Sequence, residues 1–204
     1  MKKLLIATTN PGKLAEIRLF LKDLKLDLPG LKDVYISGHS AENGQTFEQN
    51  AVIKAKFYCQ KSGLPTLADD GGFEIDALAG EPGVKSHRWI NQKREDTDGE
   101  IITYIFKRMN GIKNRAAGLR AVIAFYTPEG HVATATDSVR GVVADEPSGK
   151  LTPGFPYRSV LFLPEIGKYY DHGQLTVRET QKYNHRQKIL AKLKPIIRDY
   201  FQLP

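Results

Sequence analysis

Leu64-Pro65-Thr66-Leu67-Ala68-Asp69-Asp70-Gly71-Gly72 places two adjacent carboxylates between an apolar run and a pair of glycines. An apolar run of this length, bounded by turn residues, predicts a buried strand with the two aspartates at its exposed end. In an extended chain, neighbouring side chains point to opposite faces, so only one of the two carboxylates can bind a given metal ion directly. We therefore expect one aspartate at a metal site and the other in a structural role. A plain turn is the alternative, because Asp and Gly are common turn residues.

Strand-like and helix-like segments alternate along the chain, without repeats or low-complexity linkers. This alternation predicts an α/β domain with a largely buried sheet. The 204 residues are expected to form a single domain, residues 1–204, which is long enough to bury a substantial core. Besides the run before Asp69, the expected strands are Leu4 to Thr8, Leu119 to Tyr126, His131 to Thr136, Val139 to Val143 and Val160 to Leu163.

Residues that favour helix ends bound the expected helices. Asn10 is suited to cap a first helix, with Pro11 at its first position. Thr46 to Gln49 has the pattern of a capping box, and the helix that it opens is expected to end at Gly63. The remaining expected helices are Asp96 to Met109 and a basic helix from about Gln187, kinked or broken before Pro195.

Composition limits the possible classes of protein. The chain has 30 Lys and Arg against 23 Asp and Glu, and its formal charge of +7 favours an anionic ligand, either nucleic acid or a small polyphosphate. Its single cysteine, Cys59, cannot form an intrachain disulfide and is expected to be a small buried side chain. The apolar run near the start is too short for a secretion signal, and none approaches the roughly 20 residues of a membrane span. We therefore expect a cytoplasmic protein without membrane contact.

Two further segments are candidates for binding an anion or a metal. Thr8-Thr9-Asn10-Pro11-Gly12-Lys13 joins a strand directly to a helix start, where backbone N–H groups and the helix dipole attract anions and Lys13 adds a mobile charge. The glycine spacing of a Walker A loop is missing. On the second helix, Asn50 and Lys54 share a face that Glu42 can approach from the preceding loop. Magnesium commonly uses one or two carboxylates, which fits Glu42 with Asp70. A plain strand–helix joint and a polar helix surface are the alternatives.

Several motifs together resemble those of the inosine triphosphate pyrophosphatase family. The segments that carry the resemblance are Ala7 to Lys13, Glu42 to Phe47, Asn50 to Lys56, Leu67 to Asp70, Ala77 to Arg88 and Asn184-His185-Arg186. They span nearly the whole chain in the family's order. The resemblance implies a long mixed β-sheet flanked by helices in two lobes with a central cleft, and a homodimer. It also implies Mg²⁺-dependent hydrolysis of dITP, ITP or XTP to a monophosphate and pyrophosphate.

The resemblance further implies roles for individual residues. Glu42 and Asp70 would hold the magnesium ion. Asp70 would also help to activate the attacking water, and Lys54 would neutralise charge beside the metal. The implied substrate-binding residues are Thr8, Thr9, Asn10, Gly12, Lys13 and Gly71 on the phosphate side, with Phe155, Tyr157, His185 and Arg186 on the base side. An aromatic ring offers a stacking surface for any base, whereas an arginine can donate to a six-keto oxygen but meets the amino group of adenine poorly.

The second half of the chain departs from the family pattern. In Gly154-Phe155-Pro156-Tyr157-Arg158-Ser159, Arg158 stands where the family usually has a carboxylate. Thr180 aligns with an expected lysine, with Lys182 two positions away, and glycine and asparagine replace expected serines at positions 71 and 184. These changes predict hydrolysis with an altered base preference. The alternatives are a nucleotide-binding homologue that has lost turnover, and a nucleic-acid-binding protein, which lacks any recognisable motif for that role.

Overall fold

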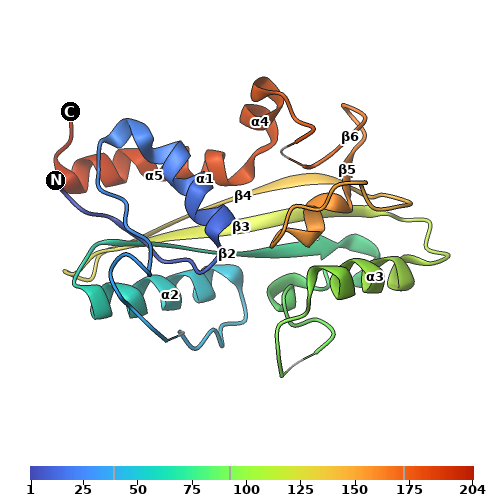
Figure 1. Ribbon diagram of the computed structural model, residues 1–204, viewed down its shortest axis with the longest axis horizontal. Helices are drawn as coiled ribbons and strands as arrows, with labels where there is room; N and C mark the ends of the chain where they lie inside the picture. Colours follow the sequence, from blue (N-terminus) through green and yellow to red (C-terminus); the bar gives the residue numbers. More distant parts are fainter. Residues whose placement is uncertain (39, 92, 172) are drawn as a thin grey trace. The chain divides into compact units, whose positions relative to one another are not determined.

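Six strands form one mixed sheet in the order β1-β2-β3-β4-β5-β6 (Figure 1). β1 is parallel to β2, while β5 is antiparallel to both β4 and β6. The strands are β1 Leu5–Ile6, β2 Thr66–Ile75, β3 Ala116–Tyr126, β4 Val132–Val143, β5 Leu161–Leu163 and β6 Lys168–Tyr169. This computed structural model describes residues 1–38, 40–91, 93–171 and 173–204. The mixed sheet with its helices confirms the expected α/β class.

Helices α1 and α2 begin where the sequence predicts, and α2 also ends there. The side chain of Asn10 caps α1, and Thr46 caps α2, which ends at a left-handed Gly63. The capping box predicted at Thr46 is incomplete, because Gln49 Oε1 accepts from the N–H of Gln45, at 2.7 Å, instead of that of Thr46. The helices are α1 Pro11–Leu21, α2 Phe47–Ser62, α3 Asp98–Met109, α4 Val177–Tyr183 and α5 His185–Phe201. No helix in the described part of the chain is long and apolar enough to cross a membrane.

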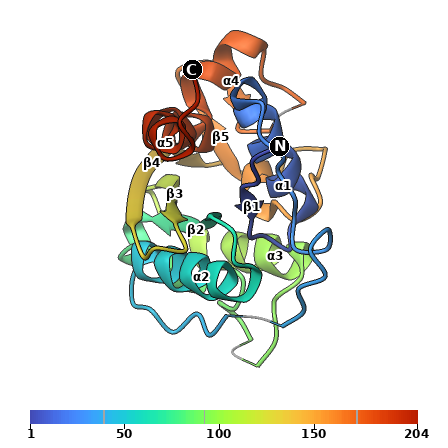
Figure 2. The same cartoon turned by 90° about the vertical axis from the view of Figure 1, so that its left-hand side faces the viewer.

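The chain divides into two compact units. The first contains residues 1–70, 121–137 and 185–204, and the second contains residues 71–120 and 138–184. In the first unit, α1 and α5 cover one face of the strands and α2 covers the other (Figures 1 and 2). Leu67 packs in the core under α1 and α5, whereas its neighbour Ala68 packs in the core under α2. Consecutive residues of β2 therefore face different helices, as a strand's alternation requires.

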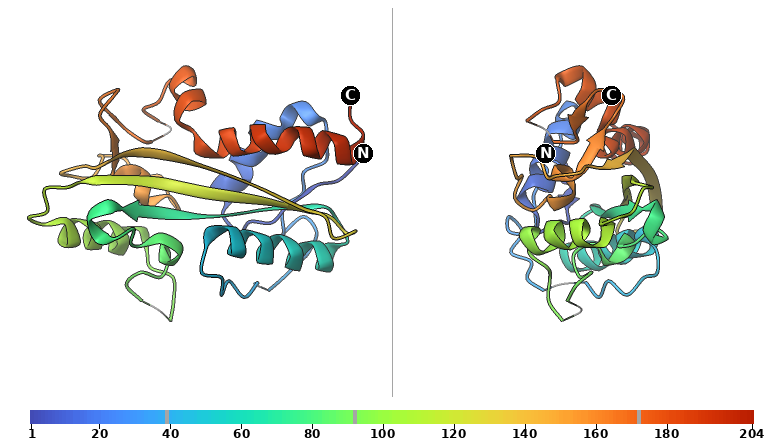
Figure 3. Two further views of the ribbon diagram at one scale, coloured as in Figure 1. Left: turned by 180° about the vertical axis from the view of Figure 1, so that it is seen from behind. Right: turned by 90° about the vertical axis from the view of Figure 1, so that its right-hand side faces the viewer.

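The second unit has its own core, formed around α3 and the remaining parts of the central strands (Figure 3). Ile101 and Ile105 of α3 are fully buried there, together with Phe73 and Ile75 of β2. A short 3₁₀ helix, Pro156–Ser159, contributes Tyr157 to the same core. Burial of these large apolar side chains stabilises this unit.

The structure corrects the predicted end of the strand that carries the two aspartates. β2 continues to Ile75, so Asp69 and Asp70 lie within the strand and not at its exposed end. Gly71 and Gly72 do not terminate it, because the apolar side chains beyond them are buried in the core of the second unit. A turn at this position, the alternative reading, is therefore wrong. β4 is also longer than predicted, with one strand in place of two.

The last helix was predicted to start near Gln187 and to kink or break before Pro195. The start is two residues earlier, at His185, and α5 continues through Pro195 to Phe201, so the predicted break is wrong. A kink at Pro195 stays a prediction. Proline removes one helical hydrogen bond, here that of the Ala191 carbonyl, but Ala191 and Pro195 are both exposed and water can replace the lost donor. Helix α4 had no predicted counterpart, and α3 begins at Asp98, after its cap, and not at Asp96.

Candidate active site

Lys54 contacts both of the carboxylates that were predicted to bind metal. Its Nζ lies 3.1 Å from Glu42 Oε2 and 3.5 Å from Asp70 Oδ1. The lysine comes from α2, Glu42 from the preceding loop and Asp70 from β2. The side chains of Lys54 and Asp70 are 14% and 15% exposed, and that of Glu42 is 37% exposed. The structure thus brings these three residues together in the first unit.

Burial and charge act in opposite directions on this cluster. Burial raises the pKa of the Asp70 carboxyl to about 6, and repulsion by Glu42 adds to this, although Lys54 and Lys13 attract the charged form. Burial alone lowers the pKa of Lys54, but attraction by Asp70 and Glu42 outweighs it and raises that pKa above its usual value. An ammonium ion therefore faces a carboxylate that is easily protonated near neutrality. Additional positive charge beside Asp70 would favour its ionised form.

Asp69 lies on the other face of β2 in a separate ionic cluster. Its side chain is 1% exposed, and its Oδ2 lies 3.0 Å from Nε of Arg186 and 3.2 Å from Nζ of Lys13. Burial favours the neutral acid, but the two cations outweigh it and hold the pKa of Asp69 well below its usual range. Burial also lowers the pKa of Lys13. This geometry agrees with the prediction that one of the two aspartates is structural.

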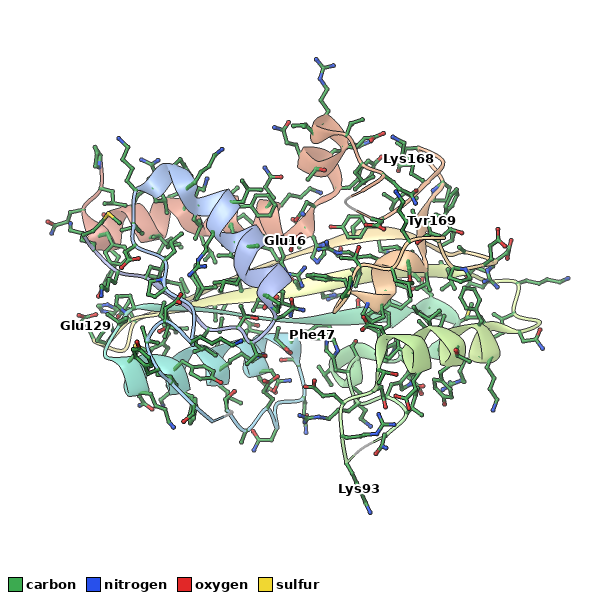
Figure 4. The ribbon with its side chains drawn as sticks, viewed as in Figure 1. Glu16, Phe47, Lys93, Glu129, Lys168 and Tyr169 are labelled. Atoms are coloured by element: carbon green, nitrogen blue, oxygen red, sulfur yellow. The ribbon has the colours of Figure 1, made fainter. Side chains whose placement is uncertain are left out.

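The Asp69 cluster includes a carboxylate that the sequence analysis missed. Nη1 of Arg186 lies 3.5 Å from Oε2 of Glu16, which projects from α1 (Figure 4). Its signal in the sequence is its position three residues after Lys13, on the same helical face. Arg186 therefore joins α5 to α1 and β2, and the preceding His185 is buried at the start of α5. The predicted contacts of His185 and Arg186 with a base stay predictions.

The segment Thr8 to Lys13 is ordered by its own hydrogen bonds. Asn10 Oδ1 accepts from the N–H groups of Gly12 and Lys13, at 2.9 and 3.2 Å, and Thr8 Oγ1 accepts from the N–H of Asn10. The cap thus uses the two N–H groups that a phosphate at the helix start would otherwise take. Lys13, expected to be mobile, is held by Asp69. Phosphate binding by Thr8, Thr9 and the other residues of this segment stays a prediction.

Of the predicted base-side residues in the second unit, Tyr157 is buried and Phe155 is half-buried. Tyr157 is a core residue whose ring stacks on Phe73 with centroids 4.9 Å apart, and its hydroxyl donates to the carbonyl of Ser86. The guanidinium carbon of Arg158, also buried, lies 4.0 Å from the centroid of the Phe155 ring. Arg158 therefore makes a cation–π contact with Phe155. Substrate contacts of Phe155, Tyr157 and Gly71, the first residue of this unit, stay predictions.

Comparison with known proteins identifies the family. A sequence profile of the Ham1 family matches residues 4–196. The chain belongs to the Ham1 family. It is 37% identical to a dITP/XTP pyrophosphatase of Thermus thermophilus, over 97% of this chain and 92% of the relative. A dITP/XTP pyrophosphatase of Bacillus subtilis is 32% identical, over 97% of this chain and 98% of the relative. The solved structure of a HAM1 protein from Coxiella burnetii has a TM-score of 0.83 and 29% identity, and the match covers 98% of this chain and 100% of that one.

Two departures of this Ham1 protein from the family pattern lie on or beside α4. Lys182, close to the position where a lysine is expected, is exposed and lies 3.3 Å from Glu165, while Thr180 lies within the helix. Asn184 follows as the buried C-cap of α4. Within the described ranges, no group of three or more His, Cys, Asp or Glu side chains is placed to hold a metal ion. Metal binding by Glu42 and Asp70 stays a prediction.

Proposed function

We propose that this Ham1 protein hydrolyses non-standard purine nucleoside triphosphates, such as dITP, ITP and XTP, to the monophosphate and pyrophosphate. The observation that carries the proposal is the cluster in which Lys54 contacts both Glu42 and Asp70. Family membership and relatives named dITP/XTP pyrophosphatases support the reaction and the substrate class. Hydrolysis of a phosphoanhydride depends on charge stabilisation and a positioned water. A side-chain nucleophile is not required, which agrees with the buried position of Cys59.

The carboxylates of Glu42 and Asp70 fit a magnesium ion. Nucleotide pyrophosphatases generally use a divalent metal, and Mg²⁺ prefers oxygen ligands, often one or two carboxylates completed by substrate phosphates and water. Both carboxylates contact the same ammonium group, that of Lys54, so they lie close to each other. When bound, the metal would supply Lewis-acid stabilisation of charge on the phosphate oxygens. Glu42 and Asp70 are the residues that would hold it.

The side chains around the proposed site have different roles in the reaction. Asp70, whose ionised form is favoured by the charges of Lys54 and Lys13, accepts a proton from the attacking water. The ammonium of Lys54 stabilises the negative charge that develops on the phosphates. Lys13 contributes a second positive charge, and Asp69 keeps it in place. The oxygen of the water, and no atom of the protein, forms the new bond to the α-phosphorus. The bond from that phosphorus to the bridging oxygen breaks, and pyrophosphate leaves.

The proposal also covers how the base is bound and how the protein assembles. The ring of Phe155 offers a stacking surface, and Arg158 on that ring is the reason to expect a base preference different from that of relatives with a carboxylate at this position. We also propose that the protein acts as a homodimer in the cytoplasm. A nucleic-acid-binding role has less support, because cations of α5 are balanced locally: Lys192 lies 2.8 Å from Asp137 and Lys194 lies 2.7 Å from Asp23.

The test is a panel of nucleoside triphosphates assayed for pyrophosphate release with and without Mg²⁺. We expect turnover of dITP, ITP or XTP well above that of the four ordinary deoxynucleotides, and none after the metal is chelated. Tight nucleotide binding without any product would favour the homologue that has lost turnover. Absence of turnover on every member of the panel would refute the enzyme assignment.

A further inference from the structure

We propose that Asn50 is a positioning residue that holds the Glu42 loop, residues 41–46, against helix α2. By doing so it sets the affinity of the Glu42 and Asp70 carboxylates for a divalent cation. The inference rests on the proposed function, because it takes these two carboxylates as the metal ligands. Asn50 itself is not a ligand in this proposal and acts only through the loop.

The first observation is a partly buried hydrogen bond between helix and loop. Asn50 is 4% exposed, and its Oδ1 accepts from the backbone N–H of Gly44 at 2.8 Å. Because only the oxygen of an amide side chain can accept from an N–H group, this bond also determines which way the amide is turned. Losing such a bond leaves a buried polar group unsatisfied, which makes the contact costly to break.

The second observation is the close approach of the loop to the helix at Gly44. A Cβ atom on Gly44 would lie 2.6 Å from Asn50 Oδ1 and 2.8 Å from Gln49 Cβ. The φ angle of Gly44 lies outside the left-handed region, so an alanine is compatible with the local backbone. Glycine is therefore required here because any side chain would clash with α2. Without a side chain at position 44, the loop can approach closely enough to donate to Asn50.

The third observation concerns what holds Glu42 itself. The Glu42 side chain is 37% exposed, and its ion pair with Lys54 is of the partly exposed kind that contributes little alone. Gly44, two residues later, is fixed by Asn50, and Gln45 is fixed by Gln49. Lys54 lies about one helical turn beyond Asn50 on α2. A single helix thus carries both the anchor of the loop and the lysine that Glu42 contacts.

The experiment uses the whole chain and Mg²⁺ alone as the probe. The rise in the midpoint of thermal unfolding is measured against Mg²⁺ concentration for the wild type, Asn50→Ala, Asn50→Asp and Gly44→Ala. Gln60→Ala, an exposed amide on the same helix, is the matched control. The Mg²⁺ dependence of turnover on dITP is measured in parallel.

We expect Asn50→Ala to weaken Mg²⁺ binding by about 10- to 100-fold, the usual effect of losing a partner that orients a metal ligand. Turnover at saturating Mg²⁺ should stay close to wild type. Asn50→Asp keeps an acceptor oxygen for Gly44 and should retain Mg²⁺ binding. Gly44→Ala perturbs the same contact from the loop side and should weaken binding even if Asn50→Ala does not fold.

Two results would overturn the inference while leaving the proposed function intact. One is wild-type Mg²⁺ binding in both Asn50→Ala and Gly44→Ala while Glu42→Gln loses it. The other is an Asn50→Asp variant that binds Mg²⁺ as weakly as Asn50→Ala does, although it keeps an acceptor oxygen for the Gly44 N–H. If the wild type neither binds Mg²⁺ nor hydrolyses any nucleotide, the proposed function fails and the inference fails with it.

Discussion

The carboxylates of Asp69 and Asp70, consecutive in β2, contact different cations on opposite faces of the sheet. Asp69 Oδ2 lies 3.0 Å from Nε of Arg186, whereas Asp70 Oδ1 lies 3.5 Å from Nζ of Lys54. The alternation of side chains along the strand separates them. Their surroundings then shift the two pKa values in opposite directions, down for Asp69 and up for Asp70. We therefore expect substitution of Asp70 to affect mainly catalysis and substitution of Asp69 to affect mainly stability.

Asp70→Asn should reduce turnover on dITP by about 100-fold or more, because it removes the proposed base for the attacking water. The fold should survive, since the amide has the shape of the carboxyl and burial already disfavours the charge. Pyrophosphate release and circular dichroism measure the two effects. Asp145→Asn, at an exposed carboxylate in the second unit, serves as the control. Wild-type rates in Asp70→Asn would show that Asp70 is not catalytic.

Lys54→Met should lower kcat by about 100- to 1,000-fold, the usual loss when one group that stabilises transition-state charge is removed. Mg²⁺ binding should be as strong as in the wild type or stronger, because a cation beside Glu42 and Asp70 is gone. Kinetics at saturating Mg²⁺ and direct Mg²⁺ titration separate these outcomes. Lys56→Met, an exposed lysine of the same helix, is the control. Weaker Mg²⁺ binding together with an unchanged kcat would contradict the assigned role.

Asp69→Asn should lower the free energy of unfolding at pH 7 by about 3–5 kcal/mol, because Lys13 and Arg186 would lose the charge that compensates them in a buried site. Urea unfolding measures this loss. The ion pair of Arg115 with the exposed Asp145 gives the comparison, and Asp145→Asn should cost about 1 kcal/mol or less. Equal effects in the two variants would mean that the Asp69 cluster does not stabilise the fold.

The contribution of Asp70 to the stability of the metal-free protein should fall as the pH rises from about 4 to 6. The pKa of Asp70 is 3.8 in an unfolded chain and about 6 in the folded protein. Between these pH values the folded state retains a proton that the unfolded chain releases. The contribution of Asp70 to the free energy of unfolding is complete below pH 3.8 and is lost as the pH rises past about 6. The total loss is about 3 kcal/mol at most. The difference in unfolding free energy between wild type and Asp70→Asn isolates this contribution.

Mg²⁺ provides the check on this pH dependence. A cation held by Asp70 lowers the pKa of that carboxyl, so saturating Mg²⁺ should flatten the slope between pH 4 and 6. A slope of the same size in wild type and Asp70→Asn would show that another group is responsible.

Local sequence signals predicted the parts of the fold that depend on neighbouring residues. Asn10, Thr46 and Gly63 were each expected at a helix end and each lies there, because capping needs only the residue and the adjacent turn. The opposite orientations of Asp69 and Asp70 follow from strand geometry alone. The same holds for Asn50 and Lys54, four residues apart on one face of α2, which both contact the Glu42 loop.

Boundaries that depend on distant packing were predicted poorly. Gly71 and Gly72 suggested a strand end, but burial of Phe73 and Ile75 extends the strand past them. Pro195 suggested a kink or break in the last helix, but buried side chains on both sides of it, such as Leu193 and Ile197, keep α5 continuous. In both cases the strand or helix buries more apolar area by continuing. The free energy gained from that burial outweighs the tendency of the glycines or the proline to end the element.

The sequence by itself determined which residues are candidates for the chemistry. It did so through the family motifs, the two aspartates and their alternation across the strand. These features depend on covalent order and on a periodicity that every strand or helix shares. Only the tertiary structure decided which charges meet. Asp69 is paired with Arg186, more than a hundred positions away in the chain, and both are shielded from water by the core of the first unit. Such pairing depends on which elements pack together, and no local pattern encodes that choice.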